Sequence, residues 1–371
     1  MRRIKTCLIL LILVITCTSC APRAFSESFA FSRDDIPMIH NMEELKEYVE
    51  EQLQFGSVEF SFSTKELDMD DIQNINSMLH GYYGDVTKCK SEGTILSSTV
   101  NMTLYCKLSD NYYVERNYYK GEKIPEDNKE ARELAKACRK ILKKMTREVG
   151  KDASDYEKEL WIHDYIVTHT SYGYEEGEDA QSEDSAAHES YGALVSHRAV
   201  CNGYSFAMKL LCNLAGLDCR IITGQGNDEN HAWNMVKIDD EWYHVDVTWD
   251  DPSPDQEGRI VYTYFNINDE RASLSHTWNT ARYPEATCMD NNYYIKNDLF
   301  CEDYDEFKEK CIQILQEKDR NRIQLMVGDY DGSIYSESNM EFLFDYSDAR
   351  SFNYQSLGEI PYMTLVINLN H

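Results

Sequence analysis

The sequence has few basic residues for its acidic content. It holds 37 lysines and arginines against 65 aspartates and glutamates, which gives a formal net charge of −28 at pH 7. Removing residues 1–19 takes away three basic residues and no acid, so the remaining chain carries −31. Nucleic acids and anionic membrane surfaces would repel such a chain. We therefore expect no nucleic-acid partner.

Recognisable metal-binding patterns are also missing. Among the nine cysteines after residue 20 no two are spaced as CxxC, which argues against a zinc site. The segment 329–332 (DYDG) lacks the remaining ligands of an EF-hand loop and reads as a turn. We expect no metal and no cofactor. The cysteines could pair in an oxidising compartment, but free thiols are favoured because four of them lie at apolar positions of their patterns: Cys106, Cys138, Cys212 and Cys311.

The apolar run near the N-terminus, residues 7–15, is too short to remain as a membrane-spanning helix. Basic residues precede it, and small residues lead to Cys20. This pattern resembles a bacterial lipoprotein signal, with Cys20 as the lipidated first residue of the mature chain. Cys17 departs from the leucine usual three residues earlier, so ordinary cleavage and secretion stay open. In both cases we expect export. If Cys20 is lipidated, the lipid would anchor the protein to the outer face of the cell membrane.

A cysteine stands at the start of a helical pattern. After Cys201 the apolar residues recur at helical spacing, and Gly216 ends the run. Cys201 is therefore expected in the first turn of a helix. There the helix dipole and the unpaired amide groups favour a thiolate and can stabilise a substrate oxyanion. The alternative is a buried structural cysteine.

A histidine and an aspartate fall on a predicted hairpin. Residues 233–238 and 241–247 alternate in polarity and are separated by Asp239-Asp240, a plausible two-residue turn. With Ile238 opposite Glu241, one face carries His231, Trp233, Asp246 and Thr248, and His231 becomes a diagonal neighbour of Asp246. A three-residue loop would break this register. The opposite face is apolar, with Ala232, Val236, Ile238, Tyr243, Val245 and Val247.

Together these residues suit nucleophilic catalysis. Asp246 can accept a hydrogen bond from one imidazole nitrogen of His231 and fix its tautomer, while the other nitrogen faces the thiol of Cys201. We therefore interpret the three residues as a Cys-His-Asp triad that attacks amide carbonyls.

Three motifs resemble the transglutaminase-like superfamily: 200–205 (VCNGYS), 231–234 (HAWN) and 242–251 (WYHVDVTWDD). The resemblance covers roughly residues 154–283, and 264–268 (YFNIN) with 275–278 (SHTW) look like its bacterial secreted branch. Ala199 departs from the glycine that many members have two residues before the cysteine. The resemblance implies an α+β, papain-like core in which the helix bearing the cysteine packs on an antiparallel sheet.

The resemblance also implies roles. Cys201 would be the nucleophile, His231 the general base and acid, and Asp246 the residue that orients His231. Tyr191 is a candidate oxyanion donor, while Trp233 and Trp249 would line an acyl tunnel or belong to the core. Hydrolysis of peptide or isopeptide bonds is favoured over cross-linking because no second pocket for an amine is identifiable. A non-catalytic binding module at the cell surface is the remaining alternative.

Small α/β modules are expected on either side of this core. Each shows a helix–strand–helix–strand pattern, which suggests an internal repeat. Two helices lead into the core, the second opened by a capping box of Ser154 and Glu157. His163 and Asp164 on that helix are interpreted as structural, and the acidic stretch 173–190 as a solvated loop. The expected segments are 1–19 (signal), 20–35 (linker), 36–124 (N-terminal module), 125–294 (catalytic domain) and 295–371 (C-terminal module).

Overall fold

The computed structural model describes residues 36–92, 99–174, 185–251, 260–317 and 321–371. The predicted signal, Cys20, the linker and most of the acidic stretch therefore lie outside the described residues. The described chain is α+β, as predicted, with three mainly antiparallel sheets and a short parallel pair of strands. None of the helices in these ranges has the length and apolar character needed to cross a membrane.

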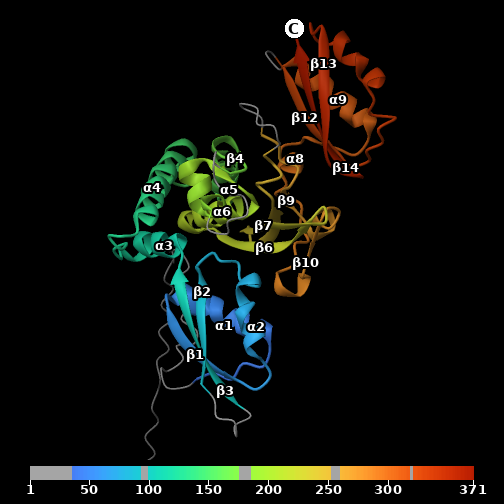
Figure 1. Ribbon diagram of the computed structural model, residues 1–371. Coiled ribbons are helices and arrows are strands. Elements are labelled where there is room, and N and C mark those ends of the chain that lie inside the picture. The colour runs from blue at the N-terminus through green and yellow to red at the C-terminus, as the bar shows by residue number, and fades with distance from the viewer. Residues whose placement is uncertain (1–35, 93–98, 175–184, 252–259, 318–320) are drawn as a thin grey trace, which may run out of the picture. The chain divides into compact units, whose positions relative to one another are not determined.

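The middle of the chain is built around a five-stranded antiparallel sheet with strand order β10-β6-β7-β8-β9. The helices of this region come mostly before the sheet in sequence (Figure 1). Its elements are α3 (Asp110–Lys120), α4 (Lys129–Val149), α5 (Asp155–His169), β4 (Ser171–Tyr172), β5 (Arg198–Ala199), α6 (Cys201–Ala215), β6 (Asp218–Gly226), β7 (Glu229–Ile238), β8 (Glu241–Val245), β9 (Phe265–Ile267), α7 (Asp269–Ala272), β10 (His276–Trp278) and α8 (Tyr293–Lys296).

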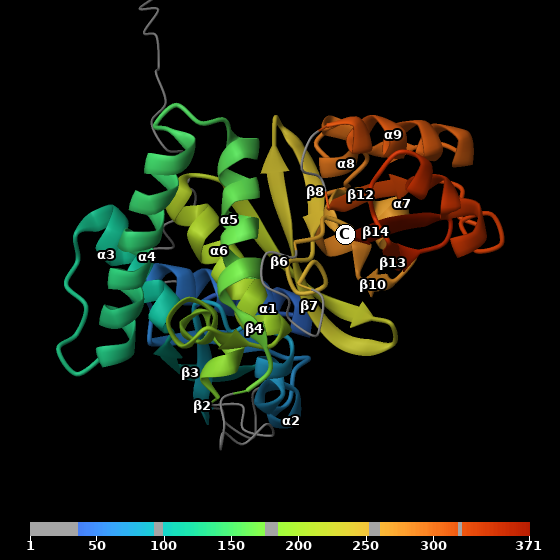
Figure 2. The same ribbon diagram turned by 90° about the horizontal axis from the view of Figure 1, so that it is seen from above.

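Helix α6 packs against one face of the sheet, mainly over β6 and β7, with α4 and α5 behind it (Figure 2). A large core forms between these helices and the apolar side of the hairpin, which contributes Val236, Ile238, Tyr243, Val245 and Val247. A smaller cluster covers the opposite face around Trp233 and Met235. The sequence predicted both the helix on the sheet and this division of the two strands into faces.

The β7–β8 hairpin has the predicted register, with Ile238 opposite Glu241. Asp239 and Asp240 both have positive φ, 51° and 69°, as a two-residue turn of this kind requires. One detail of the prediction is wrong. The second strand was expected to continue to residue 247, but β8 ends at Val245 and the chain turns directly after Asp246.

The two leading helices are also as predicted. Ser154 and Glu157 form a reciprocal capping box at the start of α5, and α4 buries Leu134, Cys138 and Ile141 along one side. Helix α3 was not predicted, because four of its eleven residues are tyrosines, which have only moderate helix propensity. Val114 of α3 joins the same apolar cluster as α4.

The two flanking modules have similar sheets, but the C-terminal one has an additional strand. The N-terminal module comprises α1 (Met42–Phe55), β1 (Glu59–Thr64), α2 (Met69–Gln73), β2 (Gly84–Glu92) and β3 (Val100–Leu108), with strand order β1-β3-β2. The C-terminal module comprises β11 (Phe300–Cys301), α9 (Tyr304–Gln316), β12 (Arg322–Val327), the 3₁₀ segment Glu337–Asp345, β13 (Ser351–Glu359) and β14 (Tyr362–Asn370), with order β11-β12-β14-β13. The N-terminal module adds strand β2 to the predicted pattern, and the C-terminal module adds β11 and β13. The order β1-β3-β2 corresponds to β12-β14-β13, but β11 has no counterpart in the N-terminal module. The internal repeat stays a prediction.

Candidate active site

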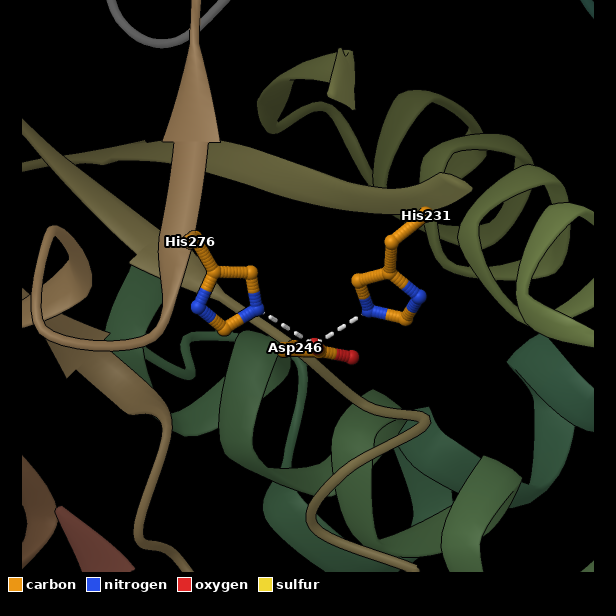
Figure 3. A group of neighbouring side chains, drawn as sticks. All are labelled: His231, Asp246 and His276. Carbon is orange, nitrogen blue, oxygen red and sulfur yellow. Dashed lines mark hydrogen bonds and ion pairs between the residues drawn. The ribbon is translucent and has the colours of Figure 1, made fainter. Parts of the chain in front are cut away.

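Three polar side chains meet where the strands of the central sheet end (Figure 3). His231 belongs to the start of β7, Asp246 follows β8, and His276 is the first residue of β10. Both imidazoles direct their Nε2 atoms at the same carboxylate oxygen, Oδ2 of Asp246. The separations are 2.6 Å from His231 and 3.0 Å from His276.

The other oxygen of Asp246 holds the turn that follows the strand. Its Oδ1 accepts the backbone N–H groups of Thr248, at 3.0 Å, and of Trp249, at 3.1 Å. An aspartate that binds the backbone two residues ahead initiates a turn, which explains why the strand stops at this point. Burial would raise the pKa of Asp246, but the charge of His231 and the hydrogen bonds from His231 and His276 hold that pKa well below its usual value. Asp246 is therefore an anion.

Cys201 is the first residue of α6, as predicted, and its side chain is partly exposed. Val200 caps the helix in an extended conformation and provides no side-chain hydrogen bond. The helix start approaches neighbouring backbone closely, since a Cβ on Gly203 would lie 2.4 Å from the carbonyl oxygen of Ala187. A larger residue at this position would push the cysteine out of place.

His231 interacts with both of the other predicted residues. Its burial would lower its pKa, but the charge and hydrogen bond of Asp246, together with a hydrogen bond and the charge of Cys201, raise that pKa to about 10. The imidazole thus stands between the sulfur and the carboxylate. At neutral pH it carries a proton that a leaving group could receive.

Two tryptophans lie against His231 and have different surroundings. Trp233 is 2 % exposed and its ring stacks at 5.9 Å from the His231 ring. Its indole N–H donates to Nδ1 of His244 at 3.0 Å, and Nε2 of His244 faces Asp269 at 2.8 Å. Trp233 is thus a core residue. Trp249 remains partly exposed and stacks on the His231 ring at 5.2 Å, so it is the more accessible of the two tryptophans.

The structure gives Tyr191 a different environment from the one expected. Its hydroxyl donates to a carboxylate oxygen of Glu133 on α4 at 2.7 Å. A proton already bound to a carboxylate is poorly available to a substrate oxyanion. We therefore give Tyr191 no part in the reaction.

Sequence reasoning missed two residues of this site. His276 lies in the SHTW motif, but its contact with Asp246 depends on β10 pairing with β6. Gly226 lies opposite His276 in that pairing. A Cβ on Gly226 would lie 2.7 Å from Trp249 and 3.2 Å from the His231 ring, so glycine leaves the space that both rings occupy.

The same cluster contains ligand types that metals use. One ligand atom each from His231, Asp246 and His276 lies within 4.8 Å of the others, and imidazole and carboxylate both bind zinc. The hydrogen bonds described above nevertheless account for the arrangement by themselves. All four acceptor positions of the Asp246 carboxylate are filled by protein N–H groups.

His163 and Asp164 belong to a second cluster of polar side chains, in which Asp164 is partly exposed. Nε2 of His163 lies 3.2 Å from Oδ2 of Asp250, and Nδ1 lies 3.0 Å from Oδ1 of Asp164. Both His163 and Asp250 are fully buried, which agrees with the structural role expected for His163. All nine cysteines in the described part of the chain are free thiols.

Comparison with known proteins identifies the class. Residues 143–247 match the model of the transglutaminase-like superfamily, and the chain carries a domain of that superfamily. It is 31% identical to kyphoscoliosis peptidase of Mus musculus over 108 residues, covering 26% of this chain and 16% of the relative. The Homo sapiens peptidase is 25% identical over 167 residues, covering 38% and 24%.

The chain therefore spans no more than 24% of the length of these curated relatives. Among solved structures, that of a TGase aligns with 16% identity and a TM-score of 0.29, over 60% of this chain and 61% of the other.

Proposed function

We propose that the protein is a cysteine-dependent acyl-transfer enzyme that acts on peptide or isopeptide amides. The observation that carries the proposal is the position of His231, whose ring interacts with the Cys201 sulfur and hydrogen-bonds the Asp246 carboxylate at 2.6 Å. Cys201 would be the nucleophile, His231 the proton carrier, and Asp246 the residue that orients His231.

The first half of the reaction forms an acyl-enzyme. The Cys201 thiolate attacks the amide carbonyl, a C–S bond forms, and the carbonyl oxygen becomes an oxyanion at the N-terminus of α6. When the tetrahedral species collapses, the C–N bond breaks and the His231 imidazolium gives its proton to the departing amine. His231 is then neutral and can act as a base.

The second half decides between hydrolysis and cross-linking. Neutral His231 takes a proton from the incoming nucleophile, which attacks the thioester and releases the sulfur. We favour water because an amine competes only if a second pocket holds it close to the thioester. The names of the curated relatives, which are peptidases, support the same choice.

Export belongs to the proposal as well. The apolar run 7–15 and the small residues before Cys20 support cleavage before that cysteine and its lipidation, which would anchor the enzyme to the outer face of the membrane. A Cys20→Ser variant should lose the detergent partitioning of the native chain. Unchanged partitioning, or a mature N-terminus at another residue, would contradict this part of the proposal.

The test of the reaction compares the wild-type protein with Cys201→Ala and with a matched control, Cys89→Ala. Cys89 is also partly exposed, but burial raises the pKa of its thiol. Wild type and Cys89→Ala should show rapid alkylation of one thiol by iodoacetamide at neutral pH and should cleave casein. Cys201→Ala should lose both the rapid alkylation and the cleavage and remain folded. Casein cleavage by Cys201→Ala would refute the mechanism.

The same incubation with a labelled primary amine distinguishes hydrolysis from cross-linking. New peptide termini without label on casein mean hydrolysis. Efficient labelling without new termini would make the protein a cross-linking enzyme. Neither product, with no selective alkylation of Cys201, would favour a binding module.

A further inference from the structure

We propose that His276 is a positioning residue for the acyl-transfer reaction, acting through Asp246. This inference rests on the proposed function. The Nε2–H group of His276 would be the fourth donor to the Asp246 carboxylate. It would fix the plane of that carboxylate and, through it, the orientation of the His231 ring.

The hydrogen bonds to Asp246 occupy the lone-pair positions of both carboxylate oxygens. Thr248 and Trp249 donate to Oδ1, and the two histidines donate to Oδ2. A carboxylate has about four lone-pair sites, so each site has its donor. Without His276, His231 would be the one donor of these four that still binds Oδ2. The carboxylate of Asp246 could then tilt together with the His231 imidazole and would no longer fix its orientation.

The direction of the hydrogen bond follows from its partners. An ionised carboxylate can only accept, so Nε2 of His276 must carry the proton. Nδ1 of His276 lies 2.9 Å from the hydroxyl oxygen of Ser275, which can donate to a neutral imidazole or accept from a charged one. In both protonation states of His276, Nε2 donates to Asp246.

His276 is itself held rigidly. It is 2 % exposed, and its backbone is paired with Gly226 of β6. Its ring lies 4.3 Å from the ring of Trp249 and 4.7 Å from that of Trp233. The carboxylate is therefore also held by β10, a strand outside the β7–β8 hairpin that pairs with β6.

The experiment compares two replacements of His276. His276→Gln keeps an N–H donor at a similar reach, whereas His276→Leu fills the space without a donor. His276→Leu should lower kcat roughly 10- to 100-fold with KM nearly unchanged, the loss expected when one hydrogen bond to a charged group is removed. His276→Gln should recover most of this loss. The rate of Cys201 alkylation by iodoacetamide should follow the same order.

Several outcomes would overturn the inference. Wild-type kcat and alkylation rate in a folded His276→Leu variant would show that the donor is not needed. Equal losses in both variants would show that the ring matters only for packing. If His276→Leu does not fold, nitrogen NMR of the wild-type histidines decides, because an unprotonated Nε2 on His276 contradicts the proposal.

Failure of the proposed function would look different. In that case wild type would cleave and label nothing and Cys201 would not react selectively. The NMR measurement would still report whether His276 donates to Asp246.

Discussion

The side-chain amide of Asn234 joins strand β7 to the start of helix α6. Its Nδ2 donates to the carbonyl oxygen of Ser205 at 3.0 Å and lies 3.3 Å from that of Arg220 on β6. Asn234 is three residues beyond His231 on the strand, and Ser205 is one turn beyond Cys201 on the helix. This contact ties the strand that carries His231 to the helix that carries Cys201.

Replacing Asn234 should misplace the two reacting groups. Asn234 is 1% exposed, so Asn234→Leu would bury apolar atoms against two carbonyl groups and lower the free energy of unfolding by about 1–3 kcal/mol. We expect activity to fall further than this stability loss explains, because the distance from Cys201 to His231 changes. Urea unfolding and kcat/KM measured on the same samples separate the two effects. A stable variant with full activity would show that the spacing is set elsewhere.

The pH dependence of activity should report the pKa of His231. Because that pKa is raised to about 10, the imidazolium should persist through neutral pH and kcat/KM should fall on the alkaline side only near pH 10. In Asp246→Asn the stabilising anion is absent, so the pKa of His231 drops and the alkaline limb moves to lower pH. An alkaline limb near pH 6.5 in wild type, or an unmoved limb in Asp246→Asn, would contradict this reading.

The relative placement of Cys201, His231 and Asp246 could be predicted from sequence because it depends on local rules. Cys201 follows from a helix start, and the relation of His231 to Asp246 follows from a two-residue turn and the twofold repeat of a strand. The end of β8 was missed because it depends on Asp246 binding the backbone ahead of it. Alternation alone would have continued the strand.

His276 could not be predicted in the same way. It is 30 residues from Asp246 in sequence, and strand β10 has three residues, too few to show a period. The position of His276 depends on which edge of the sheet strand β10 joins. The packing of the whole domain determines that edge. Strands β2 and β13 were not predicted from the sequence for a related reason. Most of their side chains are exposed or half exposed, so they show no clear apolar alternation.

Gly226 is the second site residue that was not predicted from the sequence. Its replacement tests whether the Trp249 and His231 rings need the space that glycine leaves. Gly226→Ala would place a methyl group 2.7 Å from Trp249 and 3.2 Å from the His231 ring. We expect both rings to shift and kcat/KM to drop about tenfold or more, since small misplacements of catalytic groups are costly. Gly332→Ala is the matched control, because a Cβ there meets nothing closer than 3.6 Å. Unchanged kinetics in Gly226→Ala would show that Trp249 adjusts without moving His231.

The buried pair of His163 and Asp250 should be structural, and stability tests this separately from activity. Asp250 accepts the backbone N–H of Tyr264 at 2.9 Å, and its own N–H donates to the carbonyl of Asp246 at 3.1 Å. His163→Leu would leave Asp250 buried without its cation. We expect a loss of about 3–5 kcal/mol in the free energy of unfolding at pH 7, measured by urea denaturation.

The sign of the pH effect on this variant follows from Asp250. Burial raises its pKa to about 6 even beside His163, whose hydrogen bond and charge lower it, and removing His163 should raise it further. A carboxyl group with a raised folded-state pKa stabilises the fold when it is protonated. The difference in free energy of unfolding between wild type and His163→Leu should therefore become smaller as pH falls from 7 to 5. Adding Asp250→Asn to His163→Leu keeps an acceptor for Tyr264 without the charge, and it should restore part of the stability at pH 7. A His163→Leu variant as stable as wild type at both pH values would show that this pair does not hold the turn beside Asp246.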